Sequence, residues 1–145
     1  MRRKEFIRNT AVGTSGLILT THLYSQNNSL FKKKRKITIL HTNDTHSNID
    51  AFPDNHAKYP GLGGISKRYS LIQKIREEEG NVLLLDAGDI FQGTPYFNTF
   101  KGVLEMKLMS QLQYDASTMG NHDFDAGLEG FYKAKKYANF PFLCS

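Results

Sequence analysis

Three short polar motifs, each placed just after an apolar run, constrain this chain more than any other feature. They are Thr42-Asn43-Asp44-Thr45-His46, Gly88-Asp89 and Gly120-Asn121-His122-Asp123-Phe124-Asp125. The intervals from Asp44 to Asp89 and from Asp89 to Asn121 each match one strand-helix-strand unit of roughly 30 residues or more. In an open α/β sheet, the loops after parallel strands gather at the carboxyl edge, where ligands bind. The sequence therefore predicts one site built from all three motifs.

The residues between the motifs predict alternating strands and helices in the order βαβαβαβ. Strands are expected over residues 37–40, 82–85, 115–119 and 140–145, and helices over residues 65–79, 102–113 and 128–138. The run Val82-Leu83-Leu84-Leu85 is apolar throughout, as expected of a strand covered on both faces of a parallel sheet. The last expected strand has no turn or cap after it. We therefore expect an α/β chain that ends inside its fold.

Charge is divided unevenly along the chain. Residues 1–36 carry nine Lys or Arg and one Glu, and residues 37–145 carry ten and thirteen, so the two parts have net charges of +8 and −3. A basic chain often binds polyanions, but here the excess positive charge lies in a segment that we expect to be removed. No nucleic-acid partner is expected. The single cysteine, Cys144, excludes an internal disulfide and a Cys-based zinc cluster.

Residues 1–25 have the layout of an export signal, with a basic start, a short apolar stretch at 11–19 and then polar residues. The stretch is shorter than the ~20 apolar residues of a membrane span. The start is similar to a twin-arginine signal, and an ordinary secretory signal or a disordered basic tail are the alternatives. Residues 26–36 form a basic linker. These features predict a protein of the periplasm or the cell surface.

The first two motifs offer typical metal ligands. Asp44 and His46 are two residues apart, so in extended backbone their side chains share a face and could bind one divalent cation. Taken alone, the pair also fits ordinary loop polarity. The carboxylate of Asp89 could bridge two cations, and Gly88 would allow a sharp turn beside it. The alternative for Asp89 is a helix N-cap, and Asp86 ranks below it because it could equally be a turn residue.

The third motif adds groups suited to catalysis. Asn121 offers a neutral carbonyl oxygen as a ligand, and His122 can donate a proton or a hydrogen bond to a leaving oxygen. Asp125 can orient that imidazole, as carboxylates do in catalytic dyads. The alternative is a Gly-Asn turn followed by a capped helix that begins near Asp125. The three motifs together and in order favour the catalytic interpretation.

Taken as a set, the motifs resemble those of the calcineurin-like metallophosphoesterases, most closely the 5′-nucleotidase and UDP-sugar hydrolase branch. The likeness runs from about residue 36 to the end and is carried by residues 39–47, 84–93 and 119–125. It implies a four-layer α/β/β/α sandwich, of which residues 37–145 would be the N-terminal part.

The resemblance also implies roles for individual residues. Asp44 and His46 would bind the first of two divalent metal ions of the Zn, Mn or Fe type. Asp89 would bridge the two ions, and Asn121 would bind the second. His122, with Asn121, would contact the phosphate, and His122 with Asp125 would form the catalytic dyad. Asp123 stands where the family usually has Glu, a change that we expect to leave the role of His122 intact.

One departure from the family pattern is the lack of later histidines. The family supplies further histidine ligands downstream, but no histidine follows His122, and the others are His22, His41 and His56. We therefore expect an exported phosphoesterase acting on small nucleotide substrates, represented here by a segment that is inactive by itself. No protein partner is inferred. The alternatives are a 2′,3′-cyclic nucleotide phosphodiesterase and a non-catalytic binding or scaffold protein of the same fold.

Overall fold

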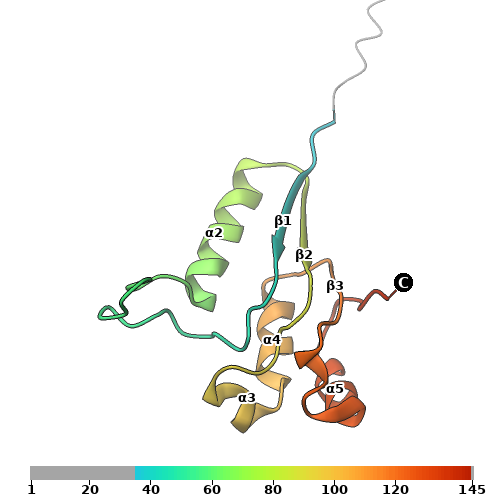
Figure 1. Ribbon diagram of the computed structural model, residues 1–145. Coiled ribbons are helices and arrows are strands. Elements are labelled where there is room, and N and C mark those ends of the chain that lie inside the picture. The colour runs from blue at the N-terminus through green and yellow to red at the C-terminus, as the bar shows by residue number, and fades with distance from the viewer. Residues whose placement is uncertain (1–34, 145) are drawn as a thin grey trace, which may run out of the picture. The chain divides into compact units, whose positions relative to one another are not determined.

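A parallel three-stranded sheet organises residues 35–144, the part of the chain that the computed structural model describes (Figure 1). Its strands lie in the order β1 (Thr38–Thr42), β2 (Val82–Asp86) and β3 (Ala116–Ser117). Helices connect each strand to the next, which confirms the predicted α/β alternation. The predicted export signal and most of the basic linker lie outside the described residues.

Five helical segments accompany the sheet within residues 35–144. They are α2 (Ile65–Glu78), α3 (Pro95–Phe100), α4 (Val103–Gln111), the 3₁₀ helix η1 (His122–Phe124) and α5 (Gly127–Lys135). The sequence predicted α2, α4 and α5 to within a few residues but missed α3. That helix has only six residues and ends where Lys101 and Gly102 adopt left-handed φ angles of 51° and 86°. It is too short to produce a readable apolar stripe.

One face of the sheet packs against the helices and forms the core. Leu40 of β1 pairs in register with Leu84 of β2, and Leu84 lies in a cluster with Ile72 of α2, Met106 of α4 and Phe131 of α5. Full burial of a side chain of this kind contributes about 1.5–3 kcal/mol. The core therefore fixes the sheet against three helices and sets the position of the strand ends.

The opposite face of the sheet is more open. Ile39 is 61 % exposed and His41 is exposed, while Leu83 and Leu85 are only partly buried. The prediction that the second strand is covered on both faces was therefore wrong for residues 35–144. A second sheet would cover this face in the four-layer arrangement implied by the sequence resemblance, which explains why its residues are apolar.

The end of the described chain runs beside β3 but does not form the predicted fourth strand. Ser117 and Phe142 make a single parallel bridge, supported by hydrogen bonds from the Ser117 amide to the Pro141 carbonyl (3.0 Å) and from the Leu143 amide to the Ser117 carbonyl (2.8 Å). The third strand is likewise shorter than predicted. No helix within residues 35–144 is long and apolar enough to cross a membrane.

Candidate functional site

The three polar motifs meet at the carboxyl edge of the sheet, each directly after one strand. Hydrogen bonds join the loops to one another. The backbone amide of Asp44 donates to the Gly88 carbonyl (3.0 Å), and that of His46 donates to the Asp89 carbonyl (3.1 Å). The amide of His122 donates to Oδ1 of Asp89 (2.9 Å). The loops after β1, β2 and β3 therefore form one continuous cluster.

Left-handed backbone is concentrated in these loops. The φ angles of Asp44, His46, Ser47 and Asp89 are 51°, 44°, 53° and 55°, and each such conformation costs roughly 1–3 kcal/mol for a residue with a Cβ atom. Besides the two interloop hydrogen bonds above, the Ser47 amide donates to the Ile90 carbonyl (2.9 Å). Strain of this kind clusters at functional sites.

Two glycines allow the second and third loops to touch. Gly88 has a φ angle of 94°, and a Cβ atom there would lie 2.4 Å from the Gly120 nitrogen. A Cβ atom at Gly120 would lie 2.1 Å from Oδ1 of Asp89. Any side chain at either position would push the Asp89 loop away from the segment that carries His122.

Asp44, His46 and Asp89 form a candidate metal site. Each offers one ligand atom, and the three atoms all lie within 4.8 Å of one another. Nδ1 of His46 lies 3.2 Å from the carbonyl oxygen of Phe91. Because a carbonyl can only accept, Nδ1 carries the proton and Nε2 is left with a lone pair for a cation. Nε2 lies 3.7 Å from Oδ1 of Asp44.

The chemistry of this donor set fits a divalent cation. Within residues 35–144, no lysine or arginine forms an ion pair with Asp44 or Asp89, so the two carboxylates share the site with no lysine or arginine to balance their charge. Two carboxylates and one imidazole suit Zn²⁺, Mn²⁺ or Fe²⁺.

His122 and Asp125 are paired beside this cluster. Nδ1 of His122 lies 2.9 Å from Oδ2 of Asp125, and this hydrogen bond raises the pKa of His122 above its usual value. The ring of His122 meets the ring of His46 edge-on, with centroids 5.3 Å apart. The side chain of His122 is 41 % exposed, so a substrate can reach it. The dyad and the candidate metal site thus share one exposed surface.

Asn121 lies on the same loop and is exposed. Its backbone carbonyl accepts the amide of Phe124 (3.2 Å), which starts the 3₁₀ helix η1. The predicted role of its side chain as a ligand of a second metal ion stays a prediction, as do the roles assigned to the other site residues.

Asp123 is a buried residue whose importance the sequence did not reveal. It is 0 % exposed, and its carboxylate accepts hydrogen bonds from the amides of Asp89 (3.1 Å), Ile90 (2.8 Å), Phe91 (3.1 Å) and Gly120 (2.9 Å). Four amide donors satisfy a charge that would otherwise be costly to bury. The only sequence signal was its place inside the third motif.

Asp86 connects the ends of all three strands. It is the last residue of β2, and its carboxylate accepts hydrogen bonds from the hydroxyls of Thr42 and Ser117, at the ends of β1 and β3. It also accepts the amide of Gly88 (2.9 Å). Burial raises the pKa of Asp86. Asp86 therefore links the strand ends from which the loops of the site begin.

The simpler structural alternatives do not describe these residues. Asp89 is not a helix N-cap, because the next helix begins at Pro95 with Thr94 as its N-cap. Asp125 does not cap α5, whose N-cap is Ala126. Of the remaining histidines, His56 stacks against Phe52 in the loop before α2, with ring centroids 4.5 Å apart.

Comparison with known proteins connects the chain to one family. The sequence matches the calcineurin-like phosphoesterase family over residues 37–145. It is 46 % identical over 112 residues to a snake venom 5′-nucleotidase of Crotalus adamanteus and 43 % identical over 113 residues to a 5′-nucleotidase of Homo sapiens. Each alignment covers 74 % of this chain, but only 19 % and 20 % of the respective relatives.

A solved structure gives the same result. The fold is similar to that of a 5′-nucleotidase precursor from Thermus thermophilus, with a TM-score of 0.68 and 36 % sequence identity over 74 % of this chain and 21 % of that one. The chain therefore spans about a fifth of the length of the relatives it matches.

Proposed function

The chain belongs to the calcineurin-like phosphoesterase family, and we propose that the whole protein is an exported, metal-dependent hydrolase of nucleotide phosphate esters. The 5′-nucleotidases among its relatives support the substrate class.

The observation that carries the proposal is the position of the His122–Asp125 pair beside the Asp44–His46–Asp89 cluster. Asp44, His46 and Asp89 would hold a divalent cation, and Asp89 and Asn121 would extend the site to a second one. When bound, such ions supply Lewis-acid stabilisation of the phosphate and an activated water. The chain's own residues would act on the leaving group and contact the phosphate.

His122 would act on the leaving group. Its Nδ1 faces Asp125, so Nε2 is the nitrogen available to the substrate. Hydrogen bonding to Asp125 raises the pKa of His122, which favours the protonated imidazole that can donate to a departing alkoxide. Asp125 would keep the ring in the orientation that presents Nε2 to the phosphate ester. Asn121 would contact a phosphate oxygen from the same loop.

Export is the second part of the proposal. It is supported by the basic and apolar pattern of residues 1–25 and by relatives described as a venom protein and as a precursor. Fusion of residues 1–25 to a reporter that is active only outside the cytoplasm tests it. The proposal requires a reporter signal that disappears when these residues are deleted.

The enzymatic proposal is tested by phosphate release from a nucleoside monophosphate. The whole protein, treated with a chelator, should lose activity and should regain it with Zn²⁺ or Mn²⁺. A parallel assay with a 2′,3′-cyclic nucleotide separates phosphodiesterase activity from monoesterase activity. Nucleotide binding without turnover under every metal condition would instead indicate a non-catalytic binding protein.

A further inference from the structure

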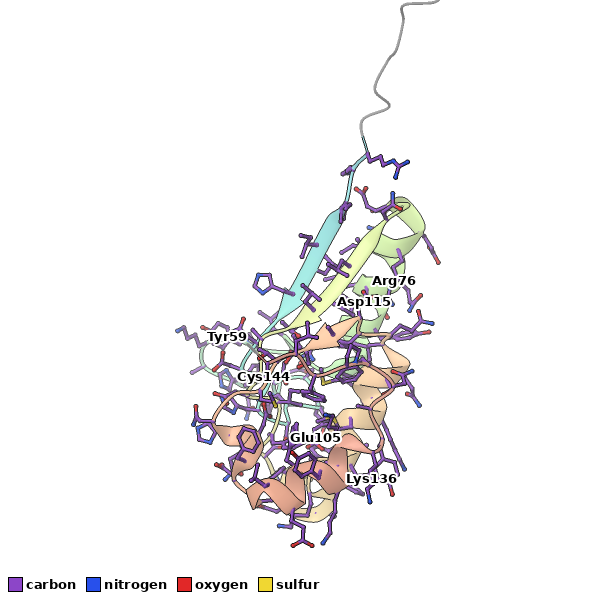
Figure 2. The ribbon with its side chains drawn as sticks, turned by 90° about the vertical axis from the view of Figure 1, so that its right-hand side faces the viewer. Tyr59, Arg76, Glu105, Asp115, Lys136 and Cys144 are labelled. Atoms are coloured by element: carbon purple, nitrogen blue, oxygen red, sulfur yellow. The ribbon has the colours of Figure 1, made fainter. Side chains whose placement is uncertain are left out.

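A buried carboxylate lies behind the loop that carries Asp44 and His46. Glu105 on α4 is 3 % exposed, and neither of its side-chain oxygens has a hydrogen-bond partner among residues 35–144. Figure 2 draws Glu105 within the body of the fold, whereas the exposed Tyr59 lies at its periphery. Buried carboxylates that lack a partner are costly, so folded proteins supply one.

Ser47 is a second buried residue whose polar side-chain atom lacks a partner within residues 35–144. It is 1 % exposed, and its hydroxyl also has no partner among the described residues. Ser47 and Glu105 line one small cavity, together with Arg68 of α2. Three buried and unpartnered oxygen atoms, one from Ser47 and two from Glu105, therefore belong to residues around a single space.

The size and charge of this cavity indicate its occupant. Its volume is about 10 Å³, which is close to the minimum for one ordered water molecule. Arg68 lines the same cavity, and its positive charge disfavours a metal cation there. A water molecule can donate to the carboxylate and exchange a hydrogen bond with the hydroxyl.

We propose that one buried water molecule bridges Glu105 and Ser47, and that Glu105 thereby acts as a positioning residue for the loop that carries Asp44 and His46. The backbone of Ser47 is already held on both sides: its amide donates to Ile90 (2.9 Å) and its carbonyl accepts the hydroxyl of Thr94 (2.7 Å). The water bridge is a third tether on a residue with left-handed backbone.

Helix α4 gives this tether a rigid anchor. Its neighbouring side chains Met106 and Met109 are 0 % and 4 % exposed and belong to the core. The loop that carries Asp44 and His46 would therefore be fixed to the hydrophobic core through Ser47, the water molecule and Glu105. Partners of this kind behind a metal ligand typically change metal affinity about 10–100-fold when they are removed.

The bridge itself is tested without metal, by a double-mutant cycle on the thermal unfolding of the whole protein in chelator. Ser47→Ala and Glu105→Met should each lower the midpoint, because each leaves the other group unpaired. The double variant should unfold at a midpoint no lower than that of the less stable single variant, because both polar groups are then gone. Glu105→Gln keeps a hydrogen-bonding group and should stay close to the unmutated protein. Additive losses in the double variant would overturn the bridge.

The positioning role, which rests on the proposed metal site, is tested by Zn²⁺ titration of the same variants. Ser47→Ala and Glu105→Met should weaken metal binding at least about tenfold, while Glu105→Gln should restore most of the affinity. Unchanged affinity in variants whose stabilities are coupled would overturn the positioning role and leave the bridge. If the unmutated protein binds no Zn²⁺, the proposed function fails with the positioning role, and the metal-free cycle still decides the bridge.

Discussion

The carboxylate of Asp123 accepts a hydrogen bond from the backbone amide of Asp89 at 3.1 Å, and through its other three amide partners it joins the loop after β2 to the loop after β3. The position of Asp89 relative to His122 therefore depends on a buried residue that contributes no atom to the proposed metal site. The amides donate and cannot accept, so they offset part of the cost of burying this carboxylate, while burial still raises the pKa of Asp123.

Replacing Asp123 by Asn should destabilise the protein. The amide nitrogen of Asn donates, so at least one backbone amide would lose its acceptor inside the fold. We expect a loss of at least about 2 kcal/mol in the free energy of unfolding, measured by urea denaturation. Asp123→Glu keeps the carboxylate and should lose less. Equal losses in the free energy of unfolding for Asn and Glu would show that keeping the negative charge does not preserve stability at this position.

The pairing of His122 with Asp125 shows what the sequence could predict. The two residues are three apart at the 3₁₀ helix η1 (His122–Phe124), and residues three apart in a 3₁₀ helix lie on the same side. The short spacing is therefore enough to predict that the side chains of His122 and Asp125 lie on the same side. The cluster of Asp44, His46 and Asp89 was also predictable, because parallel strands deliver their following loops to one edge.

The inward position of Asp123 could not be predicted in the same way. Between His122 and Asp125 it looks like one more exposed acidic residue, and only the approach of the loop after β2 gives it four amide partners. The open face of the sheet was missed for a similar reason. The apolar side chains of Leu83 and Leu85 look the same in sequence whether or not a second layer covers them.

Asp89→Asn should reduce metal binding more than any other single change in the cluster. Its carboxylate is the one predicted to serve both ions, and an amide removes the negative charge while keeping the shape. We expect bound Zn²⁺ and turnover to fall together, by at least about tenfold, as measured by metal analysis and phosphate release. Asp54→Asn makes the same chemical change at an exposed position and serves as the matched control. Unchanged metal content in Asp89→Asn would restrict this residue to a structural role.

Asp86 should make stability depend on pH in a defined direction. Burial raises its pKa in the folded state above the ordinary value of 3.8, so the folded protein binds this proton more tightly than the unfolded chain. The contribution of Asp86 to stability is therefore fully present below pH 3.8 and is lost as the pH rises through the raised pKa. Asp86→Asn removes the titration. As the pH increases through that window, the free energy of unfolding of the variant should rise relative to that of the unmutated protein, as measured by urea unfolding at a series of pH values. A difference that does not change with pH would contradict this.

The twin-arginine version of the export prediction depends on the basic residues at the start of the chain. Changing Arg2, Arg3 and Lys4 to Gln should abolish export of a fused reporter, because that route reads the paired basic residues directly. The apolar stretch at residues 11–19 is unchanged in this variant. A reporter that is still exported equally well would point to the general secretory route.

His122→Asn should separate catalysis from metal binding. If His122 donates to the leaving oxygen and does not hold a metal ion, the variant should keep its Zn²⁺ while turnover of a nucleoside monophosphate falls. General acid catalysis contributes roughly 10²–10⁴-fold, so we expect a loss of at least about tenfold. The loss should be larger for a ribose hydroxyl than for nitrophenol, because the poorer leaving group needs the proton more.

Two further variants make that test specific. Asp125→Asn should give a smaller loss with the same dependence on the leaving group, since the amide oxygen of Asn can still accept from Nδ1 and orient the ring of His122, while the carboxylate that raises its pKa is gone. His56→Asn makes the same substitution at a histidine that stacks in the loop before α2, and should leave turnover unchanged. Loss of Zn²⁺ from His122→Asn would move this histidine into the ligand set. A loss of turnover that is equal for both leaving groups would rule out proton donation as its role.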